Sequence, residues 1–175
     1  AIAEHLATFT PAAAVEALLP HVWFDPGWEV VLPLAISAHP QRDALLDDLW
    51  RFHADSPDRA QQEVDRHLEE LLLRTAAQTT PGDWNPGHTA LVHELRAEHA
   101  TENPESARDT AHWSASNASV VAAILAALPN ADPWDVSRLV AALPALVVSD
   151  ADRTQTRTAI LAALPNADPW DVSRL

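Results

Sequence analysis

Residues 123–139 read AILAALPNADPWDVSRL, and residues 159–175 repeat the same seventeen letters without a change. The two copies start 36 residues apart. A period of this length is typical of proteins that stack one small structural unit many times. The sequence therefore predicts an all-α fold, an α-solenoid of antiparallel helix hairpins of the HEAT or TPR kind with a 36-residue repeat.

The first helix of the repeated unit is indicated by apolar residues at helical spacing, namely Val120, Val121, Ile124, Leu125 and Leu128. Pro129 is expected to end this helix, because proline disfavours the helical conformation of the residue before it. Asn130 and Ala131 are expected to form the turn.

The second helix of the unit is expected to begin at Asp132, whose carboxylate can accept the free backbone N–H groups of the first turn. Pro133 suits the first helical position, where its missing N–H costs nothing. The residues predicted to be buried follow at helical spacing, namely Val136, Leu139, Val140 and Leu143, and Pro144 is expected to end or kink the helix.

Asp132, Pro133 and Trp134 are thus predicted to be structural residues of the repeat, together with their second copies Asp168, Pro169 and Trp170. A tryptophan at this position could serve as a ligand platform. Buried aromatic residues more often act in packing, so the favoured interpretation of Trp134 and Trp170 is a wedge between successive hairpins.

Two regions are predicted. Residues 114–175 hold the two near-identical hairpin repeats, the second of them truncated, and residues 1–113 form an irregular helical-repeat region of about eight helices. In that region, a helix is expected from Thr10–Pro11 to a stop at Pro20. Another is expected to follow a cap at Asp25–Pro26 and to bury residues of one stripe, namely Trp28, Val30, Val31 and Leu34.

The two copies differ only in their first nine residues. Residues 114–122 read SASNASVVA, whereas residues 150–158 read DADRTQTRT. The more apolar first copy is expected to abut the preceding helices. The polar second copy supplies the candidate partner-binding residues, which are Asp152, Arg153, Gln155 and Arg157.

Composition narrows the possible functions. The chain has no cysteine, which excludes disulfides and thiolate metal sites, and its net charge of −14 disfavours binding to nucleic acid. No stretch approaches the roughly 20 apolar residues that cross a bilayer, so no membrane partner and a cytoplasmic location are expected.

Sequence motifs for catalysis are not found. His93 and His99 flank a segment that resembles a zinc-protease helix, but that motif needs histidines four residues apart, and these are six apart. Phosphate-binding glycine loops are absent as well. No catalytic, metal-binding or cofactor-binding residue is therefore predicted.

Residues 21–32, HVWFDPGWEVVL, followed by Leu34–Ala35, resemble a segment of bacterial NACHT-type STAND NTPases, which are NLR-like signalling proteins. Helical repeats similar to ADPWDV occur in actinobacterial members. The resemblance implies the C-terminal sensor region of such a protein, whose role in bacterial immunity is to recognise a trigger. The chain lacks the nucleotide-binding motifs of the family, so the resemblance implies no ATPase residues here.

Three functions are weighed. The favoured one is a protein-recognition or sensor module of a larger signalling protein, with a protein partner and no catalysis of its own. The second is a structural spacer or a surface for self-association through the repeats. The third and most distant is a helical metal-dependent enzyme that uses the histidines and carboxylates.

Overall fold

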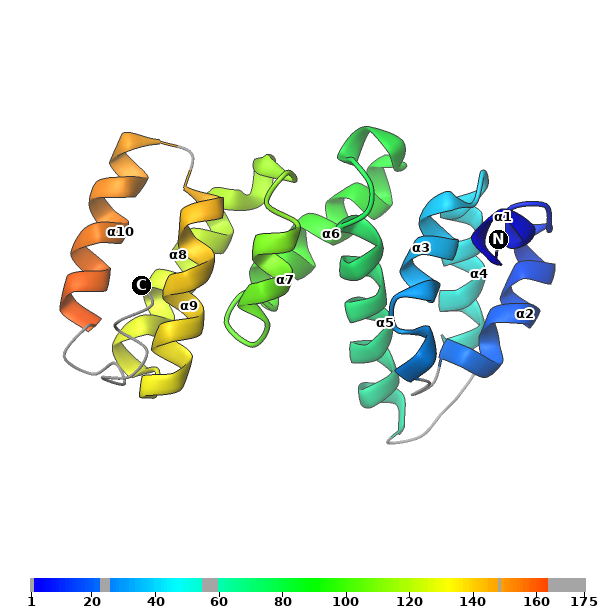
Figure 1. The fold of residues 1–175 in the computed structure, drawn as a ribbon, viewed down its shortest axis with the longest axis horizontal. Helices are drawn as coiled ribbons and strands as arrows, with labels where there is room; N and C mark the ends of the chain where they lie inside the picture. Colours follow the sequence, from blue (N-terminus) through cyan, green and yellow to red (C-terminus); the bar gives the residue numbers. More distant parts are fainter. Residues whose placement is uncertain (1, 23–25, 55–59, 148, 164–175) are drawn as a thin grey trace. The chain divides into compact units, whose positions relative to one another are not determined.

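The computed structural model describes residues 2–22, 26–54, 60–147 and 149–163. All the regular structure in these ranges is helical, which confirms the all-α prediction for them (Figure 1). The chain divides into two compact units, residues 1–89 and 90–175, and the division falls inside one helix.

In the described part of the first unit, five α-helices and two short 3-10 helices precede the helix at the division. These are α1 (Ile2–Leu6), α2 (Pro11–Val22), η1 (Pro26–Trp28), α3 (Val31–Ala38), α4 (Arg42–Ala54), α5 (Ala60–Ala76) and η2 (Pro81–Asp83). Helices two apart in the chain pack on each other, in the pairs α1 with α3, α2 with α4 and α3 with α5. Their core is mostly leucine, with Leu18, Leu46 and Leu72 almost fully buried.

The second unit follows the division inside α6 (Pro86–Glu98). It contains α7 (Pro104–Asp109), η3 (Ser114–Ser116), α8 (Asn117–Ala127), η4 (Leu128–Asn130), α9 (Pro133–Leu146) and α10 (Asp150–Ala163). The strongest packing is again between helices two apart, α7 with α9, and α8 also contacts both α9 and α10 (Figure 1).

The signals of the first repeat act as predicted. The α-helix α8 ends before Pro129, which lies in η4, and the side chain of Asp132 accepts a 2.9 Å hydrogen bond from the backbone N–H of Asp135. Pro133 occupies the first turn of α9. The side chains expected in the core are all buried, namely Val136, Leu139, Val140 and Leu143.

One proline prediction needs correction, because Pro20 does not end α2, which continues to Val22. Of the two predictions for Pro144, the helix end is wrong, because α9 continues to Leu146, and the kink stays a prediction. Val22 and Leu146 are both buried, so packing of these last residues outweighs the missing hydrogen bond of a proline near a helix end.

The predicted stripe after Asp25–Pro26 is wrong. Pro26–Trp28 forms a 3-10 turn, α3 begins only at Val31, and Asp25 lies outside the described residues. Val30 and Leu34 are exposed, whereas the buried side chains are Leu32, Pro33, Ala35 and Ile36. Because the helix starts later than predicted, a different face of it reaches the core.

Candidate functional site

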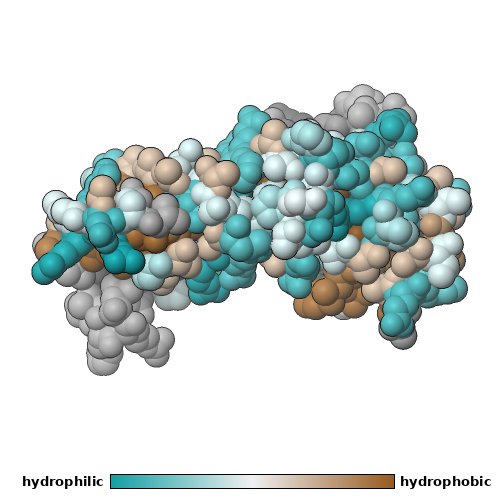
Figure 2. All heavy atoms as spheres, turned by 90° about the horizontal axis from the view of Figure 1, so that it is seen from above, coloured by the Kyte–Doolittle hydropathy of each residue, from teal (hydrophilic) through white to brown (hydrophobic). Residues whose placement is uncertain are grey.

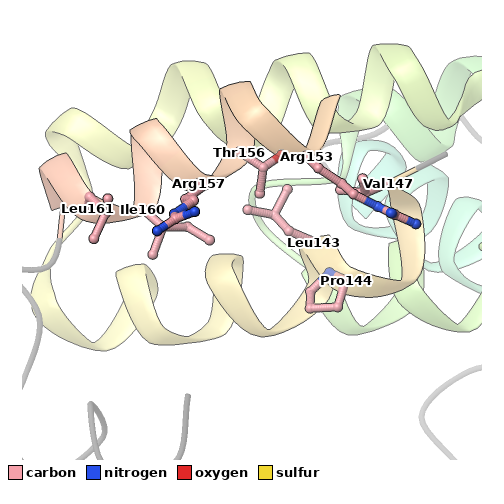
Figure 3. A pocket seen from close by; sticks show the side chains of 8 residues that line it. All are labelled: Leu143, Pro144, Val147, Arg153, Thr156, Arg157, Ile160 and Leu161. Carbon is pink, nitrogen blue, oxygen red and sulfur yellow. The ribbon is translucent and has the colours of Figure 1, made fainter. Parts of the chain in front are cut away.

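An apolar groove lies between α9 and α10, with a volume of about 400 Å³. Leu143 and Pro144 of α9 and Val147, which follows this helix, line one side, and Thr156, Ile160 and Leu161 of α10 line the other (Figure 3). Leu161 is 58% exposed, although leucine residues are usually buried. Figure 2 shows apolar surface between hydrophilic side chains on the α10 side of this unit.

Two arginines border the groove. Arg153 and Arg157 lie one helical turn apart on α10, and both are exposed. Arg153 pairs with Asp150 at 3.1 Å, but both side chains are so exposed that water weakens the attraction. The groove therefore combines an apolar floor with a positively charged edge.

Thr156 is the polar residue of the floor. It is 7% exposed, and its hydroxyl has no hydrogen-bond partner among the described residues. The residue in the same position of the first repeat is Val120, which is fully buried. A buried hydroxyl without a partner costs about 1–3 kcal/mol, so this part of the groove is less stable than its apolar counterpart.

Three of the four predicted partner-binding residues are described as side chains. Arg153, Gln155 and Arg157 are all exposed on α10. The structure brings Arg153 and Arg157 to the groove, whereas Gln155 does not line it. The side chain of Asp152 lies outside the described part of the chain.

The predictions for the structural residues of the repeat agree with the structure at some positions and disagree at others. Asp132 and Pro133 begin α9 as expected, but Trp134 is 65% exposed. This exposure contradicts the interpretation of Trp134 as a wedge between hairpins. The second copies, Asp168, Pro169 and Trp170, lie outside the described residues.

A buried arginine is the main polar feature that the sequence reasoning missed. Arg96 is only 1% exposed, and its guanidinium joins α6 to the segments that follow. It donates to Thr110 Oγ1 at 2.8 Å, to Asn117 Oδ1 at 2.7 Å, and to the Trp113 carbonyl and the Ser116 hydroxyl. Within the described ranges, no carboxylate pairs with it.

Burial lowers the pKa of Arg96 to about 10, so the side chain remains charged at neutral pH. Neutral oxygens hold this charge, and they are fixed by their own bonds, as in the 2.9 Å bond from Asn117 Nδ2 to the Ala111 carbonyl. A sequence signal existed, because Arg96 falls on the apolar stripe of Val92 and Leu95. Each nitrogen of the guanidinium thus donates to at least one oxygen of the described residues.

A second polar cluster lies in the first unit. His88 Nδ1 is 2.7 Å from Asp43 Oδ1, and His88 Nε2 is 3.1 Å from Asp47 Oδ1. Asp43 also accepts a 3.1 Å bond from the backbone N–H of Asn85. These contacts join the N-terminal turn of α6 to α4. Both ring nitrogens of His88 therefore contact carboxylates of α4 and help to hold the two helices together.

Among the described residues, no group of three histidine or carboxylate side chains is placed to hold a metal ion. His93 instead contacts the Ser116 hydroxyl at 2.8 Å. No helix in the described ranges is both long and apolar enough to cross a membrane.

Another apolar hollow, of about 480 Å³, lies in the first unit among Ile2, His5, Leu6, Phe9, Ala17 and Trp28. None of these residues was predicted to bind a partner, and this hollow lacks the charged border of the groove between α9 and α10.

Comparison of the chain with protein-family models, with curated proteins and with solved structures gave no match in any of the three.

Proposed function

We propose that this chain is a protein-recognition module, an α-solenoid of antiparallel helix hairpins with a 36-residue repeat, that binds a protein partner through α10. One observation carries the proposal. The described positions at which the second repeat differs from the first lie mostly on the exposed surface of α10, whereas the identical positions include core residues of the first repeat, namely Ile124, Leu128, Val136 and Leu139.

The repeat arrangement is supported by the packing of helices two apart in the chain. In the second unit α7 packs on α9 and α8 on α10, as expected when hairpins stack in two layers. The tie between α7 and α9 includes two hydrogen bonds of Arg138 to the Glu105 carboxylate, at 3.0 and 3.1 Å. Stacked hairpins present a continuous surface, which is how repeat proteins bind other proteins.

The exposed residues of α10 supply the specificity. Arg153, Gln155 and Arg157 replace Asn117, Ser119 and Val121 of the first repeat. Asn117 and Val121 are buried in the first copy, where the core limits which side chains fit. The corresponding positions of the second copy are exposed, so they can carry different side chains. Two arginines in a chain of net charge −14 favour an acidic patch on the partner.

The test is affinity capture from an extract of the native cells with three proteins: the wild-type chain, a triple variant and a control. The triple variant carries Arg153→Ala, Gln155→Ala and Arg157→Ala, and the control carries Thr154→Ala and Thr158→Ala on the same helix. We expect a partner that the wild type and the control retain and the triple variant loses, at equal melting temperature.

Equal capture by all three proteins would refute a recognition role for these side chains. A parallel fall in the melting temperature of the triple variant would show instead that the three residues are structural.

The parent protein is proposed to be a cytoplasmic NACHT-type STAND NTPase, with this segment as its sensor region. The support is the sequence resemblance of residues 21–32 with Leu34–Ala35, and of the ADPWDV repeats. Reading the parent open reading frame tests it. A GxxxxGK[ST] loop after a predicted strand upstream would support this assignment, and a frame without such a loop would contradict it.

A further inference from the structure

The groove between α9 and α10 has the composition of a small-molecule site. Its volume of about 400 Å³ falls within the range of about 300–1,000 Å³ that is usual for such sites. Its apolar lining comes from both helices and from Val147, which follows α9, and its polar lining residues are Arg153, Thr156 and Arg157 (Figure 3). Small-molecule sites combine these two features, apolar walls that cover the ligand and a few polar groups that orient it.

The polar part of this lining is specific to the second repeat. Thr156–Arg157 correspond to Val120–Val121 of the first repeat, which are buried. The apolar residues that follow, Ile160–Leu161, are the same as their counterparts Ile124–Leu125. The second repeat therefore keeps the apolar end of this helix face and adds a hydroxyl and a positive charge to it.

Thr156 differs from the neighbouring threonines of α10 in its hydrogen bonding. The hydroxyls of Thr154 and Thr158 donate to the backbone carbonyls four residues earlier, at 3.0 and 2.9 Å. The Thr156 hydroxyl has no partner among the described residues, although this residue is only 7% exposed. A helical threonine has two favoured rotamers, which exchange the positions of its methyl and its hydroxyl. Thr156, which lines the groove, can therefore turn an unsatisfied hydroxyl towards a ligand.

The two arginines give the groove a positive edge in an acidic chain. Arg153 shares its charge with Asp150 at 3.1 Å, whereas Arg157 pairs with no carboxylate of the described residues. This edge attracts an anion and repels a cation. A carboxylate is well matched to a guanidinium, because their charge-assisted hydrogen bonds are roughly twice as strong as neutral ones.

We propose that the groove binds a free single-chain carboxylate, a molecule of the fatty-acid class with an unbranched alkyl chain. Arg157 pairs with the carboxylate, and the Thr156 hydroxyl donates a hydrogen bond to the same group. The alkyl chain covers the apolar wall residues Leu143, Ile160 and Leu161, of which Leu161 is 58% exposed without a ligand. This ligand site is a second function of α10 and does not depend on the protein partner proposed above.

The same kind of amphipathic anion also occurs at the surface of a lipid bilayer, and the charge of the chain disfavours that source. A net charge of −14 repels an anionic bilayer surface. A free carboxylate is small enough to respond mainly to the nearby charges of Arg153 and Arg157, because salt screens the more distant ones.

The experiment is a titration of the whole chain with sodium decanoate, below the concentration at which it forms micelles, followed by methyl NMR. We expect the methyl signals of Val147, Ile160 and Leu161 to shift together and to saturate. Octanoate, which is shorter by two CH₂ groups, should bind about tenfold more weakly. Decanol keeps the alkyl chain without the charge, and should also bind about tenfold more weakly than decanoate.

Three variants test the head-group contacts. Arg157→Gln should weaken the binding of decanoate about tenfold and leave that of decanol unchanged. Arg108→Gln is its control, because it removes an exposed arginine outside the groove and should change the affinity less than about twofold. Thr156→Val should weaken decanoate binding about fivefold while the melting temperature rises, a combination that a merely structural role of Thr156 does not give.

Three results would overturn the proposal. The first is a set of groove methyl signals that do not respond to decanoate. The second is equal affinity for decanoate and decanol, or equal affinity of the wild type and Arg157→Gln for decanoate, because the charge would then play no part. The third is sedimentation of the chain with phosphatidylglycerol vesicles without binding of free decanoate, which would assign the groove to a membrane surface. Because the probes are pure compounds, none of these results depends on the capture of a protein partner.

Discussion

At the scale of single residues, the second unit buries a charge, that of Arg96, which no carboxylate of the described residues pairs with. The guanidinium of Arg96 is held by hydroxyl, amide and carbonyl oxygens from five later positions, Ala107, Thr110, Trp113, Ser116 and Asn117. An ionised group is costly to bury unless hydrogen bonds replace its water, and here they do. These hydrogen bonds explain why the first repeat has Ser116 and Asn117 where the second has Asp152 and Arg153.

Replacing this side chain with an apolar one of similar length leaves its acceptors buried without donors. Arg96→Met should therefore lower the free energy of unfolding by about 3 kcal/mol, measured by urea denaturation with circular dichroism. Arg108→Met is the control, because Arg108 is exposed and its pair with Asp109, at 3.2 Å, is exposed too, so that its effect should stay below about 0.5 kcal/mol. A loss for Arg96→Met as small as that of the control would show that the cluster does not stabilise the fold.

Thr156 gives a prediction of the opposite sign. Thr156→Val replaces a buried hydroxyl without a partner by the residue that the first repeat uses at Val120, and should raise the free energy of unfolding by about 1 kcal/mol. Thr158→Val should give no such gain, because its hydroxyl is exposed and already donates to the Thr154 carbonyl at 2.9 Å. Thermal unfolding of both variants tests this predicted difference in stability. A destabilised Thr156→Val variant would reveal a hydrogen-bond partner for the Thr156 hydroxyl.

At the scale of elements, the contact between α6 and η3 is sensitive to pH. Burial lowers the pKa of His93 below its usual 6.5, and the nearby charge of Arg96 lowers it further. The unfolded chain then binds a proton more readily than the folded one. Stability is consequently complete above pH 6.5 and declines as the pH falls from there towards the lower pKa of the folded state.

The variant His93→Gln removes this proton uptake. Its stability should depend less on pH just below 6.5 than that of the wild type, as measured by urea unfolding at a series of pH values. His112→Gln, at an exposed position, serves as the comparison. Identical slopes for the wild type and for His93→Gln would contradict the argument.

The sequence predicts the elements of the repeat better than those before it. Asp132, Pro133 and the buried stripe of α9 could be found because cap, first turn and periodicity all agree at one place. The prediction that Val30 and Leu34 are buried is wrong, because a 3-10 turn delays the start of α3 and a different face of this helix is buried. Local signals do not reveal how far such a turn extends.

The candidate site was predictable only in part. Arg153, Gln155 and Arg157 could be singled out because the two copies differ there, and all three are exposed. The groove beside them could not, because it depends on how α9 and α10 pack. The exposure of Trp134 was missed for the same reason, since a tryptophan next to a cap can face either way.

At the scale of the whole molecule, the proposed recognition module depends on one idea, that 36-residue hairpins stack on each other in register. In such proteins the stability is close to a sum over repeats and over the contacts between neighbours. A correctly matched additional unit should then add stability rather than disturb the fold.

The most direct test inserts a second copy of Ala123–Thr158 between Thr158 and Ala159, a junction that reproduces the natural sequence on both sides. We predict that circular dichroism gains helical signal in proportion to the added residues, and that the midpoint of thermal unfolding is unchanged or higher. A shortened insert, Ala123–Ala151, breaks the register and should lower the midpoint. Equal behaviour of the two inserts, or loss of cooperative unfolding with the full one, would contradict the stacked-repeat account.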